Sequence, residues 1–362
     1  MKAQLNPEQK NCFKEIVNIV EQYESNPHGY HRSGFFLQGA AGTGTTFLYN
    51  CLCSYLRAQG TIVLCVASSG IAAQLLPGGR TAHSRFKIPL SNGLHSGCNI
   101  SSNSPLAHMI RKTSLIIWDE VPMQHKSCFE AVNWTLNDLC HVSDSSLFGK
   151  IPTVLGGDFA QILPVVSRGS REATVPAWIQ HSSIWNSLQV LRLKTSMSIE
   201  ANDSNQILIG FPKSLVNDLN MYGKISLPEY IRKVETVDLL GDQLYPQALL
   251  DEAVRSHSSL IGRAILAIKN DTVTDFNNSL LDKMRATEHR LEAVNKVELS
   301  EEAPASEPYA VEYLQSINLA SIPPSSLRLK VGVPLILMRN LSPKNGMCNG
   351  TRLRVLGINQ NC

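Results

Sequence analysis

The sequence predicts an α/β fold built on a parallel sheet, and three observations support this prediction. An apolar run at residues 35–37 passes into a glycine-rich turn and then into a helix-like segment from Phe47. Further apolar runs at residues 61–67, 115–118 and 151–155 alternate with segments of helical periodicity. Acidic residues follow the last two runs. Buried parallel strands have this continuous apolar character, and open α/β sheets bind ligands at the carboxyl ends of their strands.

The first half of the chain gives the clearest element boundaries. Residues 7–23 begin with Pro7 and place Phe13, Ile16, Val17 and Val20 on one helical stripe. A second helix is expected from Phe47 to a stop at Gly60. The remaining expected elements are helices at 71–76 and 129–139, an irregular insertion at 91–105, and strands at 35–37, 61–67, 115–118, 151–155 and 190–193.

The second half of the chain is less periodic. Asn349-Gly350 is a strong hairpin signal between apolar segments near the end of the chain. The expected elements are helices at 207–221, 246–255 and 273–284, a strand at 262–267, a solvated acidic loop at 298–308, and β-structure at 327–341 and 353–356.

Composition restricts the class of protein. With 362 residues, 43% hydrophobic and 17% charged, the chain is expected to form two or more globular domains. The net charge of +3 permits a nucleic-acid partner without requiring one. No apolar run approaches the roughly 18 residues of a membrane span, and the N-terminus has no apolar signal core. Nine cysteines without a C-x-x-C pair argue against a zinc site and favour free thiols in a reducing compartment.

The glycine-rich turn has the frame of a phosphate-binding P-loop. The motif is G-x-x-x-x-G-K-[ST], and the chain reads Gly39-A-A-Gly42-Thr43-Gly44-Thr45-Thr46, with threonine in place of the lysine. Glycines let backbone N–H groups point at an anion, and the following helix N-terminus adds partial positive charge. The predicted nucleotide-binding residues are Gly39, Gly42, Thr43, Gly44, Thr45 and Thr46, with the Thr46 hydroxyl as a Mg²⁺ ligand.

Two further segments could complete a nucleotide-hydrolysing site. Asp119 and Glu120 directly follow the apolar run at 115–118. An aspartate there can hold Mg²⁺ and the adjacent glutamate can polarise the attacking water. Gln161, in L-G-G-D-F-A-Q-I-L-P-V-V, could contact the γ-phosphate. Taken singly, each of these residues is more often ordinary strand-end or surface polarity, and it is the P-loop upstream that favours the catalytic interpretation.

Several motifs in order make the chain resemble the Pif family (petite integration frequency) of superfamily-one DNA helicases, particularly the eukaryotic type related to Helitron transposons. The matching stretches, besides the P-loop, are L-N-P-E-Q at 5–9, G-I-A-A-Q-L-L-P-G-G-R-T-A-H-S-R-F-K-I-P at 70–89, W-D-E-V-P-M at 118–123, L-G-G-D-F-A-Q-I-L-P-V-V at 155–166, V-G-V-P-L-I-L-M-R-N-L at 331–341 and C-N-G-T-R-L at 348–353.

The resemblance implies a P-loop NTPase fold of RecA-like type. It implies a RecA-like ATP-binding domain at 1–175 with a DNA-contacting insertion at about 77–105, a partial second RecA-like domain at 185–320, and a small barrel-like β-ribbon at 325–358. It further implies ATP and Mg²⁺ as cofactors and movement from 5′ to 3′ along single-stranded DNA or DNA junctions. Roles in DNA repair, recombination and telomere maintenance, in the nucleus or the mitochondrion and away from membranes, would accompany that activity.

Residue roles carry over from the same resemblance. Gln9 corresponds to a glutamine that reads adenine, Glu120 and Gln161 to catalytic residues, and Asp119 with Thr46 to the Mg²⁺ ligands. The residues that match the single-stranded DNA motif are Arg80, Thr81, His83, Ser84 and Phe86. Phe86 would stack on bases while the neighbouring residues contact phosphates. For His83 and Phe86, ordinary packing is an equal alternative.

The chain also departs from the family at catalytic positions. Thr45 replaces the P-loop lysine, Ala160 stands where the family has arginine, and Ser196 and Ser198 lie in L-K-T-S-M-S where the family reads L-T-x-N-M-R. The family's C-terminal motifs are also expected to be missing after Cys362. Since cationic groups stabilise the transition state of phosphoryl transfer, we expect little or no ATP hydrolysis. The alternatives are a working helicase, a defective remnant that still binds nucleotide or DNA, and a partial transposon-derived product.

Overall fold

A computed structural model of the chain forms two compact units, Met1–Lys224 and Ile225–Cys362, and each is described by itself. The structure describes residues 2–27, 29, 33–89, 97–143, 145–161, 164, 166, 170–197, 227–255, 260–267, 269–293, 325–338, 341–342, 345–347 and 350–358. Among these residues, no helix is both long and apolar enough to cross a membrane.

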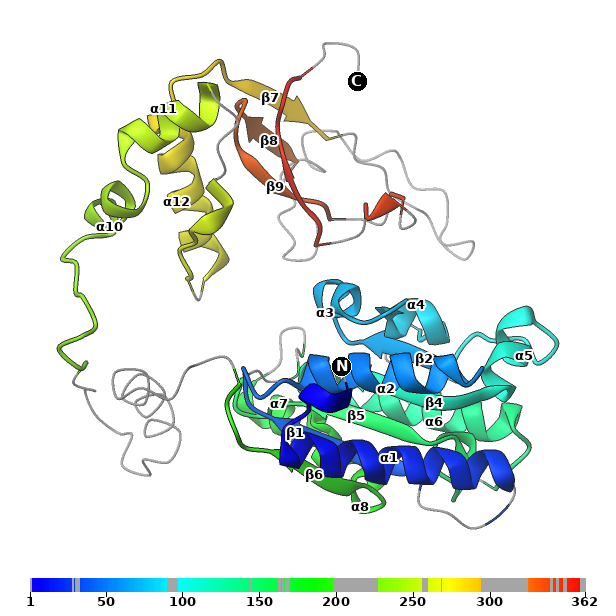
Figure 1. Ribbon diagram of the computed structural model, residues 1–362. Coiled ribbons are helices and arrows are strands. Elements are labelled where there is room, and N and C mark those ends of the chain that lie inside the picture. Colours follow the sequence, from blue (N-terminus) through cyan, green and yellow to red (C-terminus); the bar gives the residue numbers. More distant parts are fainter. Residues whose placement is uncertain are drawn as a thin grey trace, which may run out of the picture. The chain divides into compact units, whose positions relative to one another are not determined.

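The first unit is built on a six-stranded parallel sheet with the order β3-β2-β4-β5-β1-β6 (Figure 1). The strands are β1 (Gly34–Gly39), β2 (Ile62–Ala67), β3 (Arg80–Thr81), β4 (Thr113–Asp119), β5 (Thr153–Gly157) and β6 (Gln189–Leu193). The expected apolar runs are therefore strands, as predicted. Strand β1 does not pair with β2, the next strand in the chain, because β4 and β5 lie between them.

Helices cover both faces of this sheet and bury one apolar core on each side. The core on one face includes α1, α2 and α3, and the core on the other includes α4, α5, α6 and α8. The helices are α1 (Pro7–Ser25), α2 (Thr45–Ala58), α3 (Gly70–Leu75), α4 (Ala82–Phe86), α5 (Pro105–Arg111), α6 (Lys126–Leu139), α7 (Arg171–Thr174) and α8 (Ser183–Asn186). The result is the three-layer arrangement expected of a doubly covered parallel sheet.

Strand β6 corrects the predicted domain boundary. It was expected to open a second domain at 185, but Phe36 of β1 pairs with Val190 of β6 in the first sheet. Leu191 and Leu193 are buried in the same core as α1 and α2. These two side chains lose their apolar contacts if β6 leaves the sheet, so the first unit continues past β6.

The second unit combines helices with two short antiparallel strand pairs. Its elements are α10 (Val237–Leu244), α11 (Gln247–Arg255), α12 (Asn270–Lys283), and the antiparallel pairs β7 (His289–Glu292) with β8 (Ser326–Leu329) and β9 (Pro334–Ile336) with β10 (Arg352–Arg354). The expected helices at 246–255 and 273–284 are confirmed, whereas residues 262–267 form no strand and α10 was not expected. The predicted helix at 207–221 and the loop at 298–308 lie outside the described residues.

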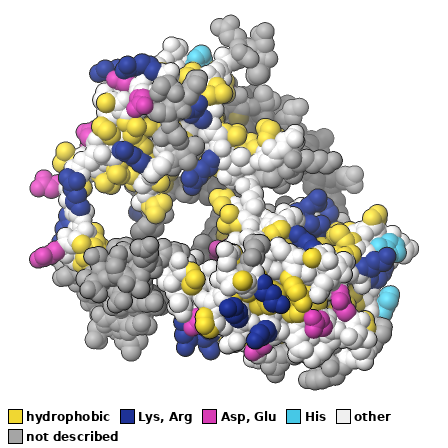
Figure 2. Space-filling model, viewed as in Figure 1, with side chains coloured by type: hydrophobic (Ala, Val, Ile, Leu, Met, Phe, Trp, Pro, Cys, Tyr) yellow, Lys and Arg dark blue, Asp and Glu magenta, His cyan; other side chains and the backbone are white. Residues whose placement is uncertain are grey.

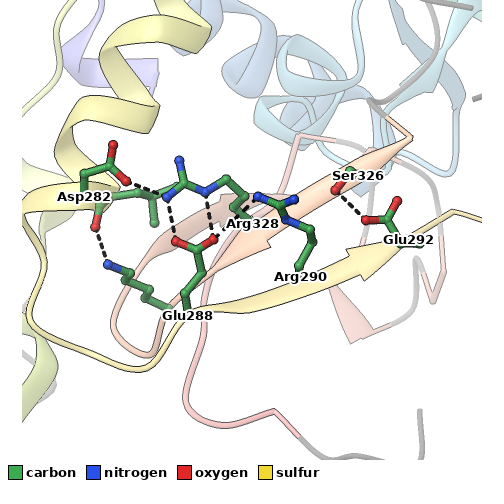
Figure 3. Close-up of polar contacts among 8 residues, drawn as sticks. Asp282, Glu288, Arg290, Glu292, Ser326 and Arg328 are labelled. Atoms are coloured by element: carbon green, nitrogen blue, oxygen red, sulfur yellow. Dashed lines mark hydrogen bonds and ion pairs between the residues drawn. The ribbon is translucent and has the colours of Figure 1, made fainter. Parts of the chain in front are cut away.

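Arg328 of β8 holds the strand pair β7–β8 against the end of α12 (Figure 3). Its guanidinium donates to both carboxylate oxygens of Glu288, at 3.0 and 2.6 Å, and also to Asp282. Beside it, the buried ammonium of Lys330 donates to the carbonyl oxygens of Leu281 and Met284, at 2.7 and 2.9 Å. The same two carbonyls also accept from the backbone N–H groups of Met284 and Ala286, at 3.1 Å each. The lysine therefore adds a positively charged donor at the C-terminal end of α12, where a cation is favourable.

Candidate functional site

The P-loop connects the end of β1 to the first turn of α2. Gly42 and Gly44 adopt left-handed backbone conformations, with φ of 81° and 79°, which suit glycine far better than other residues. Thr43 is buried, and both its N–H and its hydroxyl donate to the carbonyl of Ala40, at 3.1 and 2.7 Å. Because no side chain in the described part of the chain caps α2, its first N–H groups are available to an anion.

Thr45 packs back onto the sheet. A Cβ added at Gly39 would meet the Thr45 methyl and the Thr43 hydroxyl at 2.6 Å each, so the loop approaches the end of β1 closely. The Thr45 side chain therefore supplies a methyl contact where the motif has an ammonium group. Its backbone N–H, at the start of α2, is the part of the residue that can serve a phosphate.

Gln9 joins α1 to this loop. Its Oε1 accepts from the N–H of Asn6 at 3.0 Å as part of a capping box, and its Nε2 donates to the carbonyl of Thr43 at 3.0 Å. The side chain is buried and packs against Gly44, where an added Cβ would lie 2.5 Å from Nε2. One end of the amide thus caps α1 and the other supports the loop, and the adenine-reading role stays a prediction.

The segment after β6 also contacts the loop. The N–H of Met197 donates to the carbonyl of Gly42 at 2.7 Å. The Glu8 carboxylate accepts from the N–H groups of Lys194 and Thr195, at 2.8 and 3.1 Å, and these two bonds lower the Glu8 pKa. Ser196 therefore lies next to the P-loop, while Ser198 is outside the described residues.

Three carboxylates gather at the same edge of the sheet. Asp119 ends β4, Glu120 follows with a left-handed φ of 55°, and Asp158 follows β5. Burial raises the Asp119 pKa. Burial raises the Glu120 pKa too, with further contributions from Asp119 and Asp158. A non-glycine residue in this conformation is strained, a state that is common at functional sites.

The donors present fit a Mg²⁺ ion. The Thr46 hydroxyl, in the first turn of α2, and the buried Asp119 carboxylate are the oxygen ligands that Mg²⁺ takes, with phosphate oxygens and water completing its shell. Beside Asp119, the hydroxyl of Tyr49 is buried without a hydrogen-bond partner in the described part of the chain. Thr46 and Asp119 would hold the ion, which would neutralise charge on the phosphates.

Gln161 lies at the neighbouring strand end. Its exposed side chain donates from Nε2 to Asp158 at 3.3 Å, and the N–H of Ala160 donates to the same carboxylate at 3.0 Å. Strand β5 lies between β4 and β1 in the sheet. The structure thus brings the three predicted segments, the P-loop, Asp119–Glu120 and Gln161, to adjacent strand ends, which is where parallel sheets bind ligands.

The predicted DNA-contacting residues lie on β3, at the far edge of the sheet, and on α4. Arg80 and Ser84 are exposed, and Thr81 caps α4 by accepting from the N–H of Ser84. His83 is half-buried, and burial lowers its pKa. In the view of Figure 2, Lys and Arg side chains are scattered over both units and do not form one continuous basic patch.

Arg85 is a residue that the sequence analysis missed. It is half-buried, and its Nε has no hydrogen-bond partner among the described residues. Burial, and then the charge of Arg80, lowers the Arg85 pKa, so the two guanidinium groups are close enough to repel each other. A phosphate between them would relieve that repulsion. The signal in the sequence was an arginine inside the predicted DNA motif, T-A-H-S-R-F.

Phe86 corrects a prediction. Its side chain has no exposed surface and packs against Trp118 in the core, with ring centroids 5.6 Å apart. A base cannot stack on a ring that the protein covers, so stacking on Phe86 is contradicted and the packing alternative is correct. The remaining predicted DNA contacts stay predictions.

Comparison with known families decides what kind of chain this is. The family model of PIF1-like helicases matches residues 4–217, which is more than half of the chain. The chain belongs to the PIF1-like helicase family. A second family model, that of the 2B domain of DNA helicase Pif1, matches residues 312–358, a range that contains β8, β9 and β10.

Relatives and solved structures agree with this family. The chain is 37% identical over 136 residues to the ATP-dependent DNA helicase Pif1 of Psychrobacter sp. (strain PRwf-1), which covers 37% of this chain and 20% of the relative. It is 26% identical over 331 residues to the human ATP-dependent DNA helicase PIF1, covering 89% of this chain and 44% of the relative. The chain thus spans less than half of either relative.

The fold is that of solved Pif1 helicases. The crystal structure of Pif1 from Candida albicans superimposes with a TM-score of 0.61 at 21% identity, covering 99% of this chain and 70% of that one. The Bacteroides Pif1 complex with ADP-AlF3 and single-stranded DNA gives a TM-score of 0.59 at 17% identity, covering 94% and 70%. The predicted α/β fold of RecA-like P-loop type is confirmed.

Proposed function

We propose that this chain is an ATP-dependent DNA helicase module of the Pif1 type, which binds ATP with Mg²⁺ in its first unit and travels on single-stranded DNA. One observation carries the proposal. The P-loop, the Asp119–Glu120 pair and Gln161 lie at the ends of β1, β4 and β5, which are neighbours in the sheet. Phosphoryl transfer needs these three parts side by side: an anion cradle, a metal site and a group that contacts the γ-phosphate.

Each group has a task in this proposal. The backbone N–H groups of residues 42–46 hold the phosphates, and Thr46 with Asp119 holds the metal. Glu120, with its pKa raised by burial and by the carboxylates nearby, is the general base that polarises the attacking water. Gln161, which donates a hydrogen bond to Asp158, contacts the γ-phosphate.

We further propose that ATP turnover is slow and that the chain is a degenerate member of the Helitron-related type. Thr45 contributes a methyl where a lysine ammonium would reach the phosphates, and Ala160 and Ser198 replace arginines of the family. Losing one preorganised electrostatic donor costs roughly 10² to 10³ in rate. Within the described part of the chain, the charged groups that act on Glu120 are the carboxylates of Asp119 and Asp158, which supports the proposal.

Binding of a fluorescent ATP analogue to the full chain tests the site. We expect Mg²⁺ to strengthen binding in the unaltered chain, and Asp119→Asn to remove that dependence on Mg²⁺. Asp138→Asn, which makes the same change at an exposed position of α6, is the matched control and should bind like the unaltered chain. An affinity for the ATP analogue that changes neither with Mg²⁺ nor on Asp119→Asn would contradict the proposed site.

A further inference from the structure

We infer that Tyr49 is a positioning residue of the Mg²⁺ site, whose hydroxyl donates a hydrogen bond to the Asp119 carboxylate when that carboxylate serves the metal. The inference rests on the proposed function and extends it to a residue outside the P-loop motif. Tyr49 belongs to α2, one turn after the proposed ligand Thr46.

The position of the hydroxyl is the first observation. Tyr49 is completely buried, and its hydroxyl has no hydrogen-bond partner among the described residues. The point where a Cβ of Gly156 would stand lies 1.7 Å from that hydroxyl and 3.5 Å from Oδ1 of Asp119. The hydroxyl therefore lies against Gly156 of β5, in the space that a side chain there would fill, and near the Asp119 carboxylate.

The energetics of the hydroxyl are the second observation. Leaving a buried hydroxyl without a partner is unfavourable, and phenylalanine would fill the same space without that penalty. The hydroxyl is therefore best explained by a partner that it gains in another state of the site. Asp119 and Glu120 already act electrostatically on the hydroxyl, which agrees with its place beside them.

The chemistry of Asp119 suggests what the hydroxyl does. The carboxylate is buried at the end of β4, the strand next to β5 and Gly156. Mg²⁺ demands near-ideal octahedral geometry, so it needs the carboxylate in a fixed orientation. A hydrogen bond from the tyrosine O–H to one oxygen would hold that orientation and leave the second oxygen for the metal or its water. Groups that orient a ligand in this way affect metal affinity about 10- to 100-fold.

A Mg²⁺ titration of the full chain tests the inference, with a fluorescent ADP as the probe so that no hydrolysis intervenes. Tyr49→Phe removes the hydroxyl and keeps the ring. We expect it to raise the Mg²⁺ concentration for half-maximal binding by about tenfold, while binding in EDTA stays unchanged. Tyr55→Phe is the matched control, because Tyr55 lies on the same helix and its ring packs on Phe13. It should leave the Mg²⁺ midpoint unchanged.

A double variant assigns the effect to Asp119. In the Asp119→Asn background, which should no longer respond to Mg²⁺, Tyr49→Phe should leave the remaining ADP affinity unchanged both with Mg²⁺ and in EDTA, since its partner carboxylate is gone. An unchanged Mg²⁺ midpoint in Tyr49→Phe, in a chain whose ADP binding responds to Mg²⁺, overturns the inference and leaves the proposed function intact. If ADP binding by the unaltered chain does not respond to Mg²⁺, the proposed metal site and this inference both fail.

Discussion

The hydroxyl of Tyr49 occupies the space where a side chain at Gly156 would begin, because an added Cβ would lie 1.7 Å from the hydroxyl oxygen. Both residues are buried, one on α2 and the other on β5. Because of this contact, a tyrosine at position 49 requires a residue without a side chain at position 156, the first glycine of the L-G-G-D motif.

Gly156→Ala should therefore destabilise the first unit. Overpacking in a buried site costs about 1 to 3 kcal/mol, and the clash here is with a side chain packed from all sides. Thermal or urea unfolding of the full chain measures the effect.

Adding Tyr49→Phe to Gly156→Ala should recover part of the lost stability, since the nearest ring carbon lies 3.0 Å from the added Cβ. Gly262→Ala, with nothing within 4 Å of its added Cβ, is the control. Equal losses with and without Tyr49→Phe would show that the contact is not the cause.

Gln9→Glu separates the two tasks of Gln9. Glutamate can still accept from the N–H of Asn6 and complete the capping box, but it places an acceptor where Nε2 donates to the carbonyl of Thr43. Because a buried hydrogen bond is lost and a negative charge is brought to the phosphate loop, we expect a stability loss of about 1 to 3 kcal/mol and weaker nucleotide binding.

Gln4→Glu makes the same chemical change at an exposed residue five positions earlier and should alter neither quantity. Unfolding and fluorescent-nucleotide titrations on the two variants are the measurements. If Gln9→Glu retains both stability and nucleotide affinity, the link from α1 to the P-loop has no energetic importance.

Asp119→Asn should stabilise the fold in a manner that depends on pH. Burial raises the Asp119 pKa in the folded chain, so between the ordinary carboxyl value and the raised one the folded state binds more protons than the unfolded state. Stability then falls as pH rises through that window. Asparagine does not titrate, so the advantage of Asp119→Asn should grow as the pH rises from the ordinary carboxyl value of about 4 through the raised one.

Melting temperatures of the full chain across this range, without nucleotide or Mg²⁺, test the sign. Asp138→Asn reports the effect of removing an exposed carboxylate from the same unit. An advantage of Asp119→Asn that shrinks as pH rises would mean that the carboxylate is better satisfied in the folded state than its burial indicates.

Local patterns predicted most of the first unit. Continuous apolar runs identified β1, β2, β4, β5 and β6, since buried parallel strands are apolar on both faces. The order of the strands in the sheet did not follow from these patterns, because the apolar pattern of a strand does not specify which other strand it pairs with. The error at β6 had this cause: Leu191 and Leu193 indicate a strand, but nothing in their spacing says that β1 is its partner.

The candidate site was predicted in its parts and incompletely in its contacts. The P-loop glycines and Asp119 follow from motif and strand end. Tyr49 was missed, because its hydroxyl lies near Asp119 only by occupying the gap at Gly156, and Gly156 is more than a hundred residues from Tyr49 in the chain. Phe86 was assigned to DNA because the motif was considered without the packing of Trp118. In the second unit, weak periodicity at 262–267 suggested a strand that lacks any pairing partner in the described residues.

The P-loop keeps its glycine geometry but has threonine at position 45, where the motif has lysine. DNA-stimulated ATP turnover of the full chain, compared between the unaltered protein and Thr45→Lys, measures what that missing ammonium group would contribute to hydrolysis. Thr45→Met supplies similar length without charge and is the control. We predict turnover near background for the unaltered chain and for Thr45→Met, and an increase of about 10²-fold for Thr45→Lys. Robust turnover by the unaltered chain, with no gain from Thr45→Lys, would contradict the proposal that the missing P-loop lysine limits ATP hydrolysis.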